Sequence, residues 1–117
     1  MNQLRIRENG EVVIADILTA KILDEGEINE LGREFSNLTL EAAVGRKLLV
    51  NFQYVRLMSS SMIGRIVLLN NSCEADKIKL KLCNIAPEIF DVFKITKLNK
   101  IMTICDDEQS AIKAFGS

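Results

Sequence analysis

The sequence LLVNFQYVRLMSSSMIGRIVLLNNSC, residues 48–73, contains signals for a strand, a loop and a helix in succession. Residues 48–52 form a short, continuous apolar run, which is typical of a strand that is covered on most sides. A connection follows and ends in three serines. From Met62 to Cys73 the apolar residues recur at helical spacing, so we expect an amphipathic helix that packs on this strand.

The residues before this segment predict a hairpin and another helix. Residues 4–7 alternate between apolar and charged side chains, and residues 12–17 are rich in β-branched side chains. Asn9-Gly10 lies between them, so the two runs predict antiparallel strands with this dipeptide at the centre of the turn. Asp24 then precedes an apolar stripe over residues 28–38, which predicts an N-cap and the helix that it starts.

The residues after this segment predict two further strands, each followed by a helix. Residues 77–82 alternate strictly between lysine and apolar side chains, so we expect one face of the sheet to meet water there. Pro87 suits the first position of a helix. Residues 101–105 predict a last strand, and Asp106-Asp107-Glu108-Gln109 resembles a capping box better than a metal or acid–base site.

The predicted order of elements is β-β-α-β-α-β-α-β-α. Strands that alternate with helices predict parallel pairing and right-handed crossovers, whereas the first two strands predict an antiparallel pair. We therefore predict an α/β fold with a mixed, mostly parallel sheet and helices mainly on one face. The chain has 117 residues, about the size of one domain, and no Pro/Gly/Ser-rich linker interrupts it.

Composition excludes several classes of function. The chain has 15 basic and 16 acidic residues, no tryptophan and one tyrosine, which gives no reason to expect a nucleic-acid partner. It has no histidine, so Ser-His and Cys-His catalytic arrangements are excluded within one chain. It also lacks a glycine-rich phosphate loop and a zinc-type cysteine spacing. We therefore expect no enzyme activity, no metal and no cofactor.

Cysteine usage and hydropathy favour a reduced, cytoplasmic domain. Cys73, Cys83 and Cys105 are odd in number and fall on apolar positions, so we expect buried packing and no disulfide framework. Residues 1–11 have no apolar core of a secretory signal. No apolar run approaches the roughly 18 residues of a membrane span, so we expect no membrane insertion.

The serine run Ser59-Ser60-Ser61 is the candidate site that the residues single out. It lies where a loop turns into a helix, and a serine hydroxyl there can accept from the free N–H groups of the first turn. N-capping is therefore one interpretation. The other is phosphorylation, because a helix N-terminus stabilises an added dianion and leaves the helix folded.

Residues 48–115 resemble a STAS domain, the fold of bacterial anti-sigma factor antagonists. The resemblance begins with the strand of residues 48–52, which leads to the serine run and Gly64. Residues 79–88 resemble the family's strand followed by a Pro-Glu helix start, and residues 93–108 resemble its closing helix, strand and acidic cap. The resemblance implies a STAS-type fold for a single domain of residues 1–117.

The resemblance also implies a partner and a switch. Members of the family typically bind an anti-sigma factor that is also a serine kinase, and phosphorylation at the helix start breaks the complex. The family's site usually reads Asp-Ser-Ser/Thr-Gly. Laid over this chain, Ser59 takes the Asp position, Ser61 is the phosphoacceptor and Met62 takes the glycine position, with Ser60 as the alternative acceptor.

The hypothesis is thus a phosphoprotein that regulates transcription as an anti-sigma factor antagonist and is a monomer or weak dimer. The expected partner-binding residues lie at the helix start, with Met62 exposed: Ser59, Ser60, Ser61, Met62 and Arg65. The departures at Ser59 and Met62 favour an alternative, a phosphorylation-independent STAS subunit of a transporter or signalling complex. A domain that binds a nucleotide or another small anion at the serine run is a further alternative.

Overall fold

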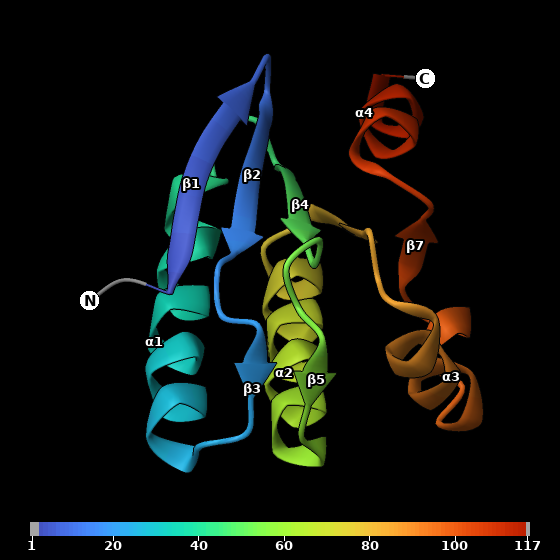
Figure 1. The fold of residues 1–117 in the computed structure, drawn as a ribbon. Coiled ribbons are helices and arrows are strands. Elements are labelled where there is room, and N and C mark those ends of the chain that lie inside the picture. Colours follow the sequence, from blue (N-terminus) through green and yellow to red (C-terminus); the bar gives the residue numbers. More distant parts are fainter. Residues whose placement is uncertain (1–2, 117) are drawn as a thin grey trace.

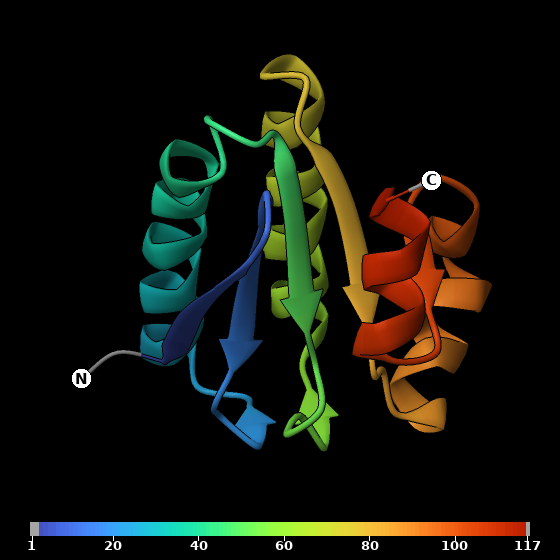
Figure 2. The same cartoon turned by 90° about the horizontal axis from the view of Figure 1, so that it is seen from above.

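The computed structural model describes residues 3–116, in which five strands form one sheet. Helices cover both faces of this sheet (Figures 1 and 2). The strand order is β1-β2-β4-β6-β7. These strands are β1 (Leu4–Asn9), β2 (Val12–Ile17), β4 (Lys47–Asn51), β6 (Lys79–Cys83) and β7 (Thr103–Cys105). A separate short pair consists of β3 (Lys21–Ile22) and β5 (Leu57–Met58). The helices are α1 (Glu25–Glu41), α2 (Ser60–Ala75), α3 (Pro87–Ile95) and α4 (Glu108–Gly116), with a 3-10 turn at Leu98–Lys100.

The pairing of the strands confirms the predicted mixed, mostly parallel sheet. β1 and β2 are antiparallel, whereas β2, β4, β6 and β7 pair in parallel. The hairpin turn lies one residue later than predicted, because Asn9 and Val12 are register partners and Gly10 and Glu11 form the loop. Gly10 has a φ of +61°, which glycine adopts without steric cost at the first position of such a turn.

The main core lies between the sheet and helices α1, α2 and α3. The predicted stripe of α1 faces inward with four buried residues, Ile28, Leu31, Phe35 and Leu38. Asp24 caps this helix as predicted, since its carboxylate accepts from the Glu27 N–H at 3.0 Å. α1 and α2 run side by side in the same direction along one face of the sheet, and both begin at the end where β3 and β5 lie (Figure 1).

Helix α4 covers part of the opposite face, which corrects the expectation that water meets the sheet there. Phe115 and Ala111 of α4 bury Leu49 and Cys83 of the sheet. The Lys81 ammonium lies 5.1 Å from the centroid of the Phe115 ring, so this lysine has an aromatic neighbour and is half-buried. The strand alternation of residues 77–82 predicts a polar face, but a helix that folds back can still cover it.

The start of α4 confirms capping as the role of the acidic run. The Asp107 carboxylate accepts from the Ser110 N–H at 2.8 Å, so Asp107 is the capping residue. Cys73 and Cys83 are buried, as expected, and Cys105 is half-buried. Within residues 3–116, none of the helices has the length and hydropathy that a membrane crossing requires.

Candidate functional site

The segment that leads into α2 is anchored to the sheet before it reaches the serines. Phe52 and Val55 are fully buried, and they fix the chain just after β4. β5 then pairs in parallel with β3, so that Leu57 and Lys21 are register partners. The Ser59 N–H donates to the Ile22 carbonyl at 3.0 Å. The first turn of α2 is therefore held at the carboxyl end of the sheet by backbone hydrogen bonds.

The three serines occupy different environments at this helix start. Ser59 is the N-cap by its extended backbone, with φ −80° and ψ 164°. Its hydroxyl makes no capping bond, and its buried Oγ has no hydrogen-bond partner among the described residues. Ser60 and Ser61 are exposed. N-capping is thus confirmed as a position but not as a side-chain bond, and the next two hydroxyls are accessible.

Met62 does not lie on the surface, so the expectation that it is exposed is wrong. Its side chain is 0% exposed and belongs to the main core. The physical reason is helical periodicity: Met62 is the first residue of the inward stripe that continues with Ile66, Leu69 and Cys73. A methionine at this position stabilises the start of α2 by packing between the helix and the sheet, and it offers no surface to a partner.

Two side-chain hydrogen bonds join the first turns of α2 and α1. The Ser61 hydroxyl donates to the Glu25 carboxylate at 3.0 Å. One turn further along both helices, the Arg65 guanidinium donates to the Asn29 side-chain oxygen at 2.5 Å. Glu25 and Asn29 are missing from the residues predicted for this site. Each lies 36 residues from its partner, so no local signal links them.

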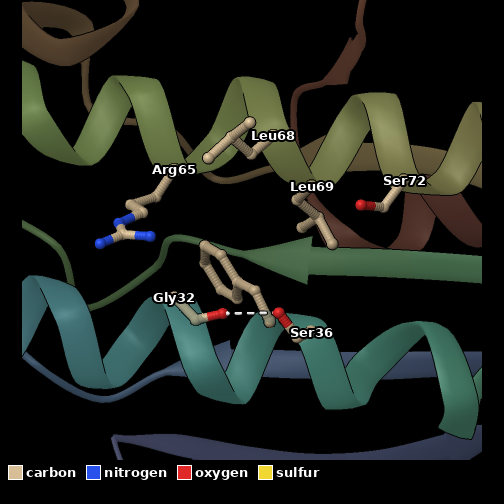
Figure 3. Close-up of a pocket in the computed structure, with 7 residues that line it drawn as sticks. Gly32, Ser36, Arg65, Leu68, Leu69 and Ser72 are labelled. Atoms are coloured by element: carbon tan, nitrogen blue, oxygen red, sulfur yellow. Dashed lines mark hydrogen bonds between the residues drawn. The ribbon is translucent and has the colours of Figure 1, made fainter.

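Arg65 also lines a hollow between the two helices (Figure 3). The volume is about 70 Å³, and Leu69 and Ser36 contribute to its walls. The Arg65 side chain passes close over Gly32, where a Cβ would lie 3.0–3.1 Å from the guanidinium and its neighbouring carbon. The absence of a side chain at Gly32 therefore makes room for Arg65 on α1.

A larger groove opens on the other side of the serine run, between β5 and α3. Its volume is about 230 Å³. Ser60 lines the groove together with apolar residues that include Leu57, Ile63 and Val92. Leu57 is 50% exposed and Val92 is 40% exposed, and Arg56 and Glu88 add one charge of each sign to the lining. Exposed apolar residues beside polar ones are the composition of a protein contact surface.

A second polar cluster lies on the face that α4 covers, around the buried carboxylate of Asp16. Arg7 contacts it at 2.7 and 2.8 Å, Arg5 at 3.0 Å, and the Asn51 amide at 2.8 Å. Burial favours the neutral carboxyl, but the hydrogen bonds from Arg7, Asn51 and Arg5 outweigh it and lower the pKa of Asp16. Arg7 also pairs with Glu108 at 2.6 Å, which ties β1 to α4. These contacts join β1, β2, β4 and α4 within the chain.

Comparisons with known proteins agree with this architecture. The family model of the STAS domain matches residues 4–111. An anti-sigma factor antagonist (STAS) domain protein from Planctomyces limnophilus superposes with a TM-score of 0.81 at 22% identity, covering 97% of this chain and 98% of the other. An anti-sigma factor antagonist from Mycobacterium paratuberculosis gives 0.83 at 10% identity, covering 97% and 93%.

The phosphorylated form of the Bacillus cell fate determinant SpoIIAA is also similar. It superposes with a TM-score of 0.70 at 22% identity, covering 96% of this chain and 98% of the other. No curated protein sequence gives a significant match. At these identities the structural likeness establishes the fold alone.

Proposed function

The chain belongs to the STAS domain family, and from this premise we propose that it is an anti-sigma factor antagonist whose binding is switched off by phosphorylation of Ser61. The observation that carries the proposal is the position of Ser60 and Ser61, two exposed hydroxyls at the start of α2 beside an exposed apolar groove. The expected partner is an anti-sigma factor with serine kinase activity, which would place the protein in the cytoplasm.

The docking surface in this proposal is the start of α2 together with the groove between β5 and α3. Ser59, Ser60, Ser61 and Arg65 remain as partner-binding residues, whereas Met62 acts only by holding the helix from below. Leu57 and Val92 supply the apolar contacts that sequence patterns did not indicate. Apolar anchors surrounded by polar residues carry most of the binding energy in interfaces of this kind.

Phosphorylation suits this surface because it adds charge without unfolding the domain. A phosphoserine carries about −1.5 to −2 charges at neutral pH. On Ser61 it would lie in the first turn of α2, where the helix dipole favours negative charge. The partner would then meet a dianion where it had met a hydroxyl. Ser60 stays the alternative acceptor, since it is exposed and lines the groove directly.

The test is partner capture from cells of the source organism with tagged wild type, Ser61→Ala and Ser61→Asp, followed by mass spectrometry. We expect an anti-sigma factor with wild type and Ser61→Ala, and its loss with Ser61→Asp. Ser60→Asp, examined in parallel, distinguishes the two acceptors. Gln109→Glu is the matched control, because it also adds one negative charge to the first turn of a helix, that of α4, where Gln109 is exposed.

The departures of Ser59 and Met62 from the family's motif favour a second candidate, a phosphorylation-independent STAS subunit of a transporter or signalling complex. A chain from the structure called "Molecular architecture of the stressosome, a signal integration and transduction hub" superposes with a TM-score of 0.69 at 12% identity. Under this candidate, all three Ser61 proteins capture the same partner. That result would refute phosphorylation control at Ser61.

A further inference from the structure

We propose that a phosphate on Ser61 is bound by Arg65 and repelled by Glu25, so that phosphorylation detaches the first turn of α1 from α2. This inference deepens the proposed function, since it rests on Ser61 as the modified residue. It assigns specific roles to two residues, one on each helix. The modified serine lies on α2, and the helix that responds to the phosphate is α1.

Phosphorylation of Ser61 turns its attractive contact with Glu25 into a repulsive one. In the unmodified chain the Ser61 hydroxyl donates to the Glu25 carboxylate at 3.0 Å. A serine phosphate in its dianionic form has only acceptor oxygens, and the carboxylate also only accepts. The hydrogen bond is therefore lost, and two like charges replace it at the same place. Glu25 is exposed, so its side chain is free to rotate away into water.

Arg65 lies four residues after Ser61 on the same face of α2, within reach of a phosphate there. Among residues 3–116 its guanidinium makes one hydrogen bond, to the neutral amide oxygen of Asn29, and no ion pair. A hydrogen bond between two charged groups is stronger than one to a neutral acceptor. A phosphate on Ser61 therefore competes favourably with Asn29 for this guanidinium.

The consequence is local to the ends of two helices. Glu25 and Asn29 lie one turn apart on α1, and they hold the two side-chain bonds to the start of α2. Both bonds are lost when the phosphate repels Glu25 and recruits Arg65. Ile28 and Leu31 remain buried under the same helix, so α1 stays on the sheet while its first turn loosens. Arg65 also leaves Gly32 and the hollow that it lines (Figure 3).

The test uses the full chain with phosphoserine encoded at position 61 during translation and follows the phosphorus-31 resonance through a pH titration. We expect Arg65→Gln to raise the pKa of the phosphate by about 0.3 unit, the size of an i,i+4 charge pair on a helix. We expect Glu25→Gln to lower it. Arg56→Gln is the matched control, because this exposed arginine belongs to the groove beside Ser60.

A second measurement follows the first turn of α1 directly. Amide hydrogen exchange of Glu27 and Ile28, whose N–H groups donate to Asp24, should be several-fold faster in the phosphoserine protein than in the unmodified one, with the rest of α1 unchanged. Circular dichroism shows that each variant is folded. An unchanged phosphate titration in Arg65→Gln, a shift in Arg56→Gln instead, or unchanged exchange would each overturn the proposal.

The two proposals fail separately. Because the phosphoserine is introduced during translation, neither a kinase nor an anti-sigma factor takes part in these measurements. If wild type and the Ser61 variants all capture the same partner, the proposed function is refuted, whereas the measured contacts of the phosphate still stand. If the phosphate does not interact with Arg65 and Glu25 as proposed, this inference is refuted, whereas the result of partner capture is unaffected.

Discussion

Asp16 on β2 and Asn51 on β4 are register partners, and the Asn51 amide donates to the Asp16 carboxylate at 2.8 Å. Both side chains are buried. The Asn51 side-chain oxygen in turn accepts from the Gln53 N–H at 3.1 Å and from the Asn84 amide at 2.9 Å. The cluster thus connects the charged side chains of the hairpin with the loop that leads toward the serine run.

This cluster makes stability depend on pH in the acid range. The pKa of Asp16 in the folded chain is lowered from its ordinary value of 3.8, so the ionised carboxylate stabilises the fold. That contribution is fully present above the unfolded value and is lost as the pH falls through the lower folded value. We therefore expect the urea concentration at half-unfolding to decrease as the pH is lowered below about 4.

Asp16→Asn tests this assignment of the acid sensitivity. The variant should show a flatter dependence of the urea midpoint on pH between about 4 and 2. Asp91→Asn is the control, since Asp91 is exposed on α3 and should retain the wild-type slope. Equal slopes in wild type and Asp16→Asn would show that other carboxylates cause the acid sensitivity.

Met62→Ala should destabilise the protein by about 2–5 kcal/mol, because it leaves a cavity under the start of α2. Met62→Leu keeps the volume and should cost less than about 1.5 kcal/mol. Leu68→Ala, at an exposed position of the same helix, should stay within about 0.5 kcal/mol of wild type. Urea unfolding measures all three. A near-neutral Met62→Ala would mean that its side chain is not packed in the core.

Gly64→Ala should stabilise the protein by about 1 kcal/mol. Gly64 lies within α2, and a Cβ built there meets nothing within 4 Å. Alanine then gains helix propensity without a clash. Gly45→Ala should have the opposite effect and destabilise the protein, because a Cβ at position 45 would overlap the Glu11 carbonyl oxygen. Thermal unfolding distinguishes them, and a lower midpoint for Gly64→Ala would contradict the open environment.

Val92→Asp should weaken capture of the anti-sigma factor by about tenfold or more, as expected for an apolar anchor of an interface. Ile95→Asp is the matched control on the same helix, because Ile95 is 81% exposed and lies outside the groove lining. We expect it to bind like wild type. If the two variants bind alike, the groove between β5 and α3 is not the docking surface.

Cysteine labelling at pH 8 should modify Cys105 first. Burial raises the pKa of the Cys73 thiol to about 11 and that of Cys83 to about 12, with nearby negative charges adding to both shifts. The thiolate is the reactive form, so both buried thiols should react only slowly while the chain is folded. A thiol-reactive disulfide reagent should show one fast thiol per chain, and Cys105→Ser should abolish that phase.

Much of the fold was predictable because its signals are local. The Asp24 cap, the Pro87 helix start and the inward stripe of α1 each depend on residues within a few turns of one another. The alternation of strands and helices then restricts the topology, since parallel neighbours require crossovers of one hand. These signals also indicated the serine run at the start of a helix, where its backbone indeed begins α2.

The contacts of the candidate site were not predictable from the sequence, because they depend on how distant elements rotate and pack. Met62 is the exception: the expectation that it is exposed was wrong although the helix was recognised, because the helical spacing of Met62, Ile66 and Leu69 already places it on the inward stripe. Glu25 meets Ser61 only because α1 and α2 lie side by side with both first turns at the same end. Local periodicity determines which residues share a face of a helix or strand, whereas the packing of distant elements determines which residues that face contacts.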